Sequence, residues 1–200
     1  MIRARSTFEA RTPFRQGAGV FRTFVVSVAV AAALVACETT PLEGESERLD
    51  SGTGTTVTVM PKPVEFIVDR TRGPKTDPFA YLAPFETNRM GSHELFLWVS
   101  APQVAGPLGV PQVFCGEEPI QLESLNASMS SIGLSSAPYK MPAPWSAQWF
   151  FKLSGEVLDC FAAAKKMKIV TKTGDEEPDT YTAEAAILSG ISDFATRVRT

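Results

Sequence analysis

The chain has 200 residues, of which 19 are Lys or Arg and 22 are Asp or Glu, so its formal net charge is −3. This length corresponds to one domain and is enough to bury a hydrophobic core. The charge balance argues against a nucleic-acid-binding protein, which needs positive charge clustered on one face.

A charged and then apolar segment opens the chain. Residues 24–36 are 13 residues in which only Ser27 is not apolar, and five arginines precede them: Arg3, Arg5, Arg11, Arg15 and Arg22. This order is typical of an export signal. A helix needs about 20 apolar residues to cross the hydrocarbon core of a bilayer, so a stable transmembrane helix is the weaker interpretation. We therefore expect residues 1–36 to be a cleaved signal peptide.

The apolar segment ends in Leu34-Val35-Ala36-Cys37. This tetrapeptide resembles the lipobox of bacterial lipoproteins, in which a cysteine that becomes acylated directly follows a cleavage site of small residues. The resemblance covers residues 1–37 and implies that Cys37 carries a diacylglycerol thioether and an N-acyl chain. Two or more acyl chains make anchoring in a membrane stable. The alternatives are an uncleaved amphipathic anchor and an ordinary secreted protein.

The same resemblance bears on the compartment. Glu38 stands where an aspartate usually signals retention at the inner membrane, so the resemblance implies the outer membrane. Residues 1–36 hold five basic residues and one acidic residue, which leaves 14 against 21 and a net charge near −7 for the processed chain. That charge argues against binding to anionic lipid headgroups by anything other than the acyl chains.

Two further cysteines remain once Cys37 is acylated. Cys115 and Cys160 form an even pair in an exported protein, where oxidation is the expected fate. We predict a disulfide between them, with two free buried thiols as the alternative. A metal site is less favoured, because the sequence has no CxxC spacing and only a single histidine. No cofactor is expected.

Residues 38–54 are acidic, rich in Gly, Ser and Thr, and almost free of apolar side chains. Such a segment cannot recover the entropy lost on ordering, so together with Cys37 it is predicted to be a lipidated, disordered tether. The single globular domain is expected to span residues 55–200.

Alternating apolar residues predict strands at residues 55–59 and 64–68, and the prolines between them indicate an edge or a bend. Residues 80–85 and 94–99 flank a polar turn at residues 87–92 and predict an antiparallel hairpin. Apolar residues point to both sides of the second hairpin strand, so both of its surfaces should be covered.

The later part of the chain is predicted to be mixed. Residues 120–122 are expected to form a short strand, and residues 124–136 a loop or a weak strand. A strand at residues 148–153 leads through Ser154, a possible N-cap, into a short helix at residues 156–166.

A second hairpin, residues 168–171 and 180–183, surrounds an acidic turn at residues 174–179. An apolar stripe at residues 187–198 predicts a closing amphipathic helix that packs on the core. The expected fold class is α+β, a mostly antiparallel sheet or sandwich with two short helices.

Catalytic and metal-binding patterns are weak. His93 lacks a nucleophile elbow or a zinc-binding helix beside it, so it is expected to be an exposed hairpin residue. The acidic turn, with Asp175, Glu176, Glu177 and Asp179, is expected to be a solvated turn. A weak cation site is its alternative, because the calcium-binding loop pattern is missing. No catalytic residue is assigned.

Aromatic residues gather in one region, at Tyr139, Trp145, Trp149, Phe150 and Phe151. Exposed aromatic rings near prolines can bind a partner or a glycan, although covering a core is their commoner role. Tyr139, Trp145 and Trp149 are the possible binding residues.

Three functions remain open from the sequence. The favoured one is a lipid-anchored, non-enzymatic envelope protein that assembles with another envelope protein at the outer membrane. The second is a module that binds a small ligand or glycan through exposed aromatic rings. An enzyme is the least expected.

Overall fold

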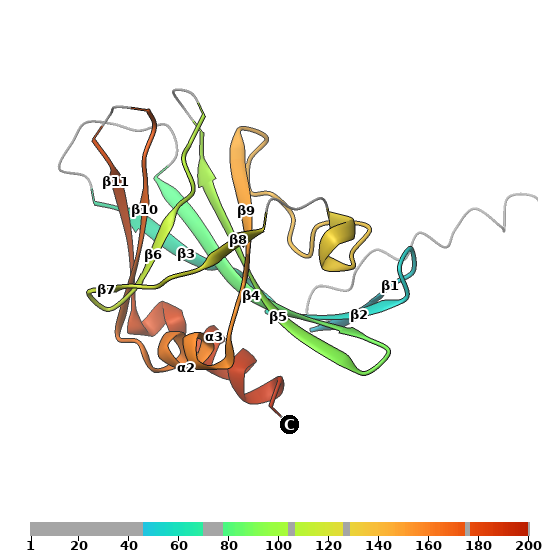
Figure 1. The fold of residues 1–200 in the computed structure, drawn as a ribbon. Helices are drawn as coiled ribbons and strands as arrows, with labels where there is room; N and C mark the ends of the chain where they lie inside the picture. Colours follow the sequence, from blue (N-terminus) through green and yellow to red (C-terminus); the bar gives the residue numbers. More distant parts are fainter. Residues whose placement is uncertain (1–45, 70–77, 104–106, 126–128, 175–176, 200) are drawn as a thin grey trace, which may run out of the picture. The chain divides into compact units, whose positions relative to one another are not determined.

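Antiparallel strands make up most of the structure, a computed structural model that describes residues 46–69, 78–103, 107–125, 129–174 and 177–199. Within these residues, eleven strands form one sheet whose paired strands are all antiparallel. Two α-helices lie against the sheet, which curls into a half-barrel (Figure 1). The fold is therefore α+β, as the sequence predicts.

Most strands precede the two α-helices, which flank the last hairpin. The strands are β1 (Glu47–Asp50), β2 (Thr55–Val59), β3 (Val64–Val68), β4 (Phe79–Arg89), β5 (Ser92–Pro102), β6 (Gln112–Cys115), β7 (Glu118–Pro119), β8 (Glu123–Leu125), β9 (Ser146–Lys152), β10 (Lys166–Thr171) and β11 (Asp179–Glu184). The helices are the 3-10 helix η2 (Met129–Ile132) and the α-helices α2 (Gly155–Ala163) and α3 (Ala185–Arg197).

The two ends of the sheet are joined by three residues. In the order β7-β6-β10-β11-β3-β4-β5-β9-β8, the end strands β7 and β8 are consecutive in the chain and are separated only by residues 120–122. Four Cα steps span about 14 Å at most, so the two ends of the sheet must approach each other. Figure 1 shows this connection crossing the open side of the curl. The curl of the sheet therefore follows from its connectivity.

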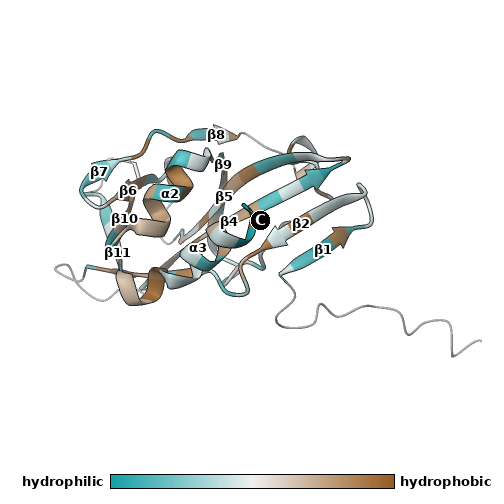
Figure 2. Ribbon diagram, turned by 90° about the horizontal axis from the view of Figure 1, so that it is seen from below, coloured by the Kyte–Doolittle hydropathy of each residue, from teal (hydrophilic) through white to brown (hydrophobic). Residues whose placement is uncertain are grey.

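One face of the sheet, here called the helix face, carries both α-helices (Figure 2). Cys115 of β6 lies opposite Met167 of β10 and is bonded to Cys160 of α2, so Met167 points toward the helices. The strand register extends this face to residues that are all buried: Ile169, Tyr181, Val68, Leu82, Val99 and Leu97. The core lies between these side chains and the two helices.

Both helices bury the sides that their apolar residues predict. In α2, Leu158 and Phe161 are buried, and the hydroxyl of Ser154 accepts a hydrogen bond from the Val157 N–H at 3.3 Å as an N-cap. In α3, the buried residues are Leu188, Ile191, Phe194 and Ala195. The predicted helices are confirmed, although α2 ends at Ala163 rather than near residue 166.

The opposite face of the sheet is covered near β4 and β5 by residues 129–145, here called the covering segment. The ring of Tyr139 lies 6.4 Å from that of Phe85 and 5.3 Å from that of Trp98. Phe96 is buried beside Phe85 on the same face, while Leu97 is buried on the helix face. The prediction that both surfaces of β5 are covered is confirmed.

The strands β2 and β3 follow one another along the same edge of β4. Val59 pairs with Phe85 and Val64 pairs with Leu82, so four residues of one chain segment lie opposite two residues of β4. Pro61 and Pro63 stand in this bulge, where no ladder hydrogen bond is required of them. The prolines therefore mark a break between two collinear strands, as their position predicts.

The hairpin of β4 and β5 is longer than the sequence suggests. Pairing continues to Arg89 and Ser92, and only Met90 and Gly91 form the turn. Both turn residues have positive φ, 54° and 85°, as two-residue hairpin turns require. The predicted turn over residues 87–92 is too long, because residues 87–89 and 92 belong to the strands. Their polar side chains reflect exposure to solvent at the end of the hairpin rather than a turn.

One prediction for the middle of the chain holds in part and another is wrong. In the predicted loop or weak strand at residues 124–136, Ser124 and Leu125 belong to the short strand β8, but the 3-10 helix η2 was not expected. Residues 120–122 are not a strand but the connection between β7 and β8. Their apolar side chains Ile120 and Leu122 pack against the core from a connecting segment. Short apolar runs cannot distinguish these two situations.

The predicted disordered tether is wrong for its last residues. Residues 47–50 form β1, which pairs with β2, and residues 51–54 form the turn between them. Polar side chains replace the missing apolar contacts here, because Arg48 and Asp50 bind the covering segment through hydrogen bonds. Residues 38–45 lie outside the described residues.

Candidate functional site

The predicted anchor, Cys37, and the export signal before it lie outside the described residues. The first described residue, Ser46, follows Cys37 by nine positions. No helix among the described residues is long and apolar enough to cross a membrane. The anchor therefore rests on the sequence resemblance.

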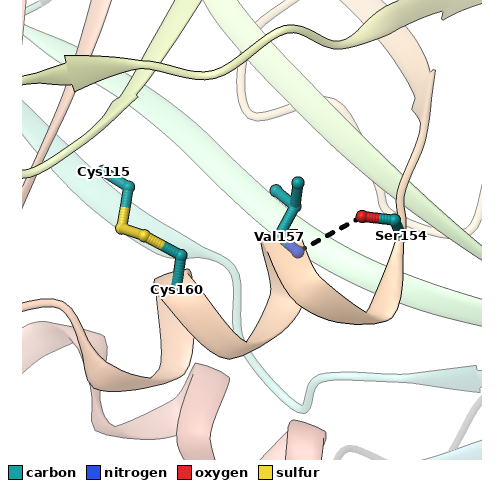
Figure 3. Close-up of a disulfide and its surroundings, with 4 residues drawn as sticks. All are labelled: Cys115, Ser154, Val157 and Cys160. Carbon is teal, nitrogen blue, oxygen red and sulfur yellow. Dashed lines mark hydrogen bonds between the residues drawn. A yellow bond between two sulfur atoms is a disulfide. The ribbon is translucent and has the colours of Figure 1, made fainter.

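The predicted disulfide between Cys115 and Cys160 is confirmed (Figure 3). Cys115 ends β6 and Cys160 lies in the last turns of α2, with 45 positions between them. The closed loop contains β7, β8, the covering segment and β9. Closing such a loop stabilises a fold by roughly 4 kcal/mol according to the chain-entropy argument. The bond thus ties one end of the curled sheet to the helix that fills it.

Tyr139 lies in the core rather than on the surface. Its hydroxyl donates a hydrogen bond to the Pro84 carbonyl at 2.6 Å and accepts one from the Met60 N–H at 2.9 Å. Burial raises the pKa of this hydroxyl far above its usual range, against the smaller opposing effects of the Met60 N–H and Arg48. Tyr139 therefore fills the bulge between β2 and β3 and is not available to a ligand.

The two tryptophans differ in exposure. Trp145 is 55% exposed, while its backbone carbonyl accepts a hydrogen bond from the Gln103 N–H at 3.0 Å. Trp149, in β9, is half-buried against the core, and its neighbours Phe150 and Phe151 are buried. Trp145 lies in the turn before β9, whereas Trp149 lies within the strand, and no ring contact joins the two indoles in the described part of the chain. The possible binding residues Tyr139, Trp145 and Trp149 thus form no shared aromatic surface, and Trp145 is the most exposed of the three.

His93 stands at the exposed end of β5, as predicted. Its Nδ1 atom lies 2.9 Å from Oε1 of Glu86, and the side chains are 56% and 10% exposed, respectively. Glu86 was not expected from the sequence, because the pairing of the two residues depends on the hairpin register. This contact joins one imidazole to one carboxylate near the surface, and neither residue lines the two pockets described below.

The acidic turn is only partly described. Asp175 and Glu176 lie outside the described residues, Glu177 is exposed, and Asp179 begins β11. Among the described residues, no group of three or more His, Cys, Asp or Glu side chains is placed to hold a metal ion. The weak cation site stays a prediction.

Asp50 fastens the covering segment to the β1–β2 turn. One carboxylate oxygen accepts hydrogen bonds from the N–H groups of Gly52 and Thr53 and from the Ser135 hydroxyl, and the other accepts one from the Ser135 N–H at 2.7 Å. Partial burial alone would raise the pKa of Asp50. The hydrogen bonds from Ser135, Gly52 and Thr53 outweigh it and lower the pKa. Residue 52 must be glycine, because a Cβ there would lie 2.7 Å from that of Ser135.

Arg48 adds a second attachment beside Asp50. Its guanidinium donates hydrogen bonds of 3.1 Å to the carbonyls of Ala137 and Pro138. The covering segment is therefore held by side chains from β1 and by the Tyr139 hydroxyl. In the sequence, only the charges of Arg48 and Asp50 within the polar residues 38–54 could have indicated this attachment.

Two of the surface pockets are lined by described residues. An apolar one of about 200 Å³ lies between the bulge and α3, with Met60, Pro63 and Ile187 in its wall. A polar one of about 180 Å³ lies between η2 and the end of the β4–β5 hairpin. Its lining residues are Thr55, Thr87, Arg89, Ser92, Glu94, Ser130, Ser131, Ile132 and Gly133.

No protein-family model, curated protein or solved structure matches this chain.

Proposed function

We propose that this chain is a lipid-anchored protein of the bacterial cell envelope, held at the outer membrane through acylated Cys37, and that it acts there as a non-enzymatic assembly or structural partner. The observation that carries the proposal is Leu34-Val35-Ala36-Cys37 at the end of an apolar segment that follows five arginines. Two or more acyl chains on Cys37 would make the attachment stable.

The disulfide supports export. Structural disulfides persist in oxidising compartments outside the cytosol, and the bond between Cys115 and Cys160 closes a large part of the domain into one loop. Cys37 then remains as the one cysteine outside this bond.

The start of the fold supports a short attachment. Nine positions separate Cys37 from Ser46, which allows a reach of about 30 Å at most. An anchored domain would therefore stay next to the membrane surface, where it can assemble with another envelope protein.

Fatty-acid labelling tests the anchor. Cells that express the full-length chain are fed an alkyne fatty acid, and the label is expected on the wild type and on Cys115→Ser/Cys160→Ser but not on Cys37→Ala. Label on Cys37→Ala, or an intact leader by mass spectrometry of the wild type, would refute acylation at Cys37.

Site-specific crosslinking in intact envelopes tests the assembly role. A photoreactive residue replaces Trp145, which is 55% exposed, and the control replaces Val110, which is 61% exposed. An adduct with an envelope protein from position 145 and not from position 110 is expected. Absence of any adduct from position 145 would count against this surface as the docking site.

The exposure of Trp145 also favours a second function, binding of a small ligand or glycan. An exposed indole offers a large area at low conformational cost. Titration with a glycan panel should then change the tryptophan fluorescence of the wild type and leave that of Trp145→Phe unchanged. A flat response of the wild type across the panel would remove this alternative.

A further inference from the structure

The polar pocket between η2 and the β4–β5 hairpin carries an inference that goes beyond anchoring and assembly. We infer that this pocket binds a small hydroxylated carboxylate, whose carboxylate pairs with Arg89 and whose hydroxyl groups meet the serine and threonine hydroxyls of the wall. The inference is independent of the acylation of Cys37.

The shape of the pocket follows from three elements. The paired ends of β4 and β5 supply Thr87, Arg89, Ser92 and Glu94, and the first residue of β2 supplies Thr55. The 3-10 helix η2 and the residue after it close the opposite side. The volume of about 180 Å³ has room for about six water molecules or an organic ligand of the same size.

The charges around the pocket favour a monoanion. Glu94 is paired with Lys152, whose Nζ atom lies 3.2 Å from its Oε1 atom. None of the described side chains forms an ion pair or a hydrogen bond with Arg89. The pocket therefore has a net charge of one unpaired guanidinium, that of Arg89. The planar guanidinium can donate two parallel hydrogen bonds to the two oxygens of a carboxylate.

A carboxylate fits better than a phosphate. A phosphate monoester carries nearly two negative charges at neutral pH and three strong acceptor oxygens. The pocket sets one guanidinium against it and places the Glu94 carboxylate nearby. The second charge would therefore be opposed rather than neutralised.

The hydroxyl groups favour a hydroxylated ligand. Five of the nine lining residues are serine or threonine. Thr55 is fully buried, and its Oγ1 atom has no hydrogen-bond partner in the described structure. Buried polar groups without a partner are rare in native proteins, so this hydroxyl marks a place where a ligand or an ordered water belongs.

Gly133 lies beside this buried hydroxyl. Gly133 has a φ of +75° and follows η2, and a Cβ at this position would lie 3.6 Å from the Thr55 hydroxyl. A side chain at residue 133 would thus extend over Thr55. The glycine therefore leaves the wall of the pocket next to Thr55 free of a side chain.

Calorimetric titration of the full-length chain in detergent micelles tests the inference. The probes are L-lactate and gluconate, with glycerol as the neutral polyol and inorganic phosphate as the competing anion. A Ser-terminated tripeptide with a free carboxylate, and the same peptide as its amide, distinguish a polypeptide terminus from a free small acid as the source of the carboxylate.

Saturable binding is expected for at least one free carboxylate and for neither glycerol nor the amide. Arg89→Gln should weaken that binding at least tenfold and Thr55→Val several-fold, while Lys140→Gln, which removes one positive charge outside the pocket, should leave it unchanged. Thermal melts of each variant establish that it is folded.

Three results would overturn the inference. They are no carboxylate binding at millimolar concentration, equal binding by Arg89→Gln and the wild type, and phosphate or glycerol binding as tightly as the carboxylates. Binding of the peptide alone would support the site and identify a polypeptide terminus as its ligand.

Discussion

Tyr139 replaces hydrogen bonds that the sheet cannot make at its bulge. The Met60 N–H and the Pro84 carbonyl lie where β2 and β3 leave the edge of β4, and both bind the Tyr139 hydroxyl. The sequence places Tyr139 among several aromatic residues. From the sequence alone, a role of Tyr139 in the core cannot be distinguished from a role in binding. The distinction depends on a bulge that forms from residues far away in the chain.

Removing this hydroxyl should destabilise the fold measurably. In Tyr139→Phe the two buried backbone groups lose their partner, and an unsatisfied buried polar group costs about 1–3 kcal/mol. Urea unfolding should show a loss in that range. Trp145→Phe is the matched aromatic control, expected to stay within about 0.5 kcal/mol because it changes an exposed side chain. Equal stability of both variants and the wild type would contradict the role given to Tyr139.

Asp50 makes the attachment of the covering segment dependent on pH. Its pKa is lower in the folded chain than the ordinary value of 3.8, so the folded state favours the charged form. The stability that this carboxylate contributes is present above the unfolded pKa and is lost as the pH falls through the folded pKa.

Asp50→Asn should therefore behave differently at two pH values. At pH 7 the variant is expected to melt at a lower temperature than the wild type, and the difference should shrink below pH 3.8, where Asp50 itself becomes protonated. Melting curves followed by circular dichroism measure both differences. Ser136→Ala, an exposed change next to Ser135, is the control. A difference that grows with acid would show that the lowered pKa is not what holds this contact.

At the level of elements, the sequence predicts the strands and helices that have a periodic apolar pattern, and it predicts the disulfide from the even number of remaining cysteines. β2, β3, β9, the β10–β11 hairpin and both helices carry clear apolar patterns, and Cys115 and Cys160 were the pair left after Cys37. β1 was missed because Arg48 and Asp50 stabilise it by hydrogen bonds to distant carbonyl and hydroxyl groups. β7 and β8 were missed because two or three residues are too few for a periodic pattern.

The disulfide should be the strongest single link between these elements. Cys115→Ser/Cys160→Ser is expected to lose about 2–4 kcal/mol in urea unfolding, because the unfolded chain regains the freedom of the closed loop. Wild-type protein reduced with dithiothreitol should match the double variant, and the wild type without reductant is the reference. An unchanged unfolding midpoint in both would mean that the helix and the sheet edge hold together without the bond.

At the level of the whole molecule, the polar pocket is beyond the reach of sequence patterns. Thr55, Arg89 and Ser130 are separated by more than thirty positions each, and only the pairing of β2 with β4 and the return of the covering segment bring them together. The proposed anchor is the opposite case. Its evidence lies in consecutive residues, and it needs no fold to be recognised.

The position of β1 limits how far an anchored domain can stand from a bilayer. Neutron reflectometry of the acylated protein on a supported membrane is expected to show protein density beginning within about 30 Å of the lipid, the reach of the nine positions from Cys37 to Ser46. Insertion of twenty Gly-Ser residues after Leu42 should widen this layer. A water gap wider than this reach in the natural chain would contradict attachment through Cys37.

The shortness of the end strands β7 and β8 affects how neighbouring copies of the chain can pair with each other. β7 has two residues, Glu118 and Pro119, and β8 has three and begins with Glu123. Charged residues, proline and short length are the features by which natural sheets discourage a foreign strand from extending their hydrogen-bond ladder. Copies that an acyl anchor would concentrate in one lipid layer would therefore gain no template for fibril growth at these two ends.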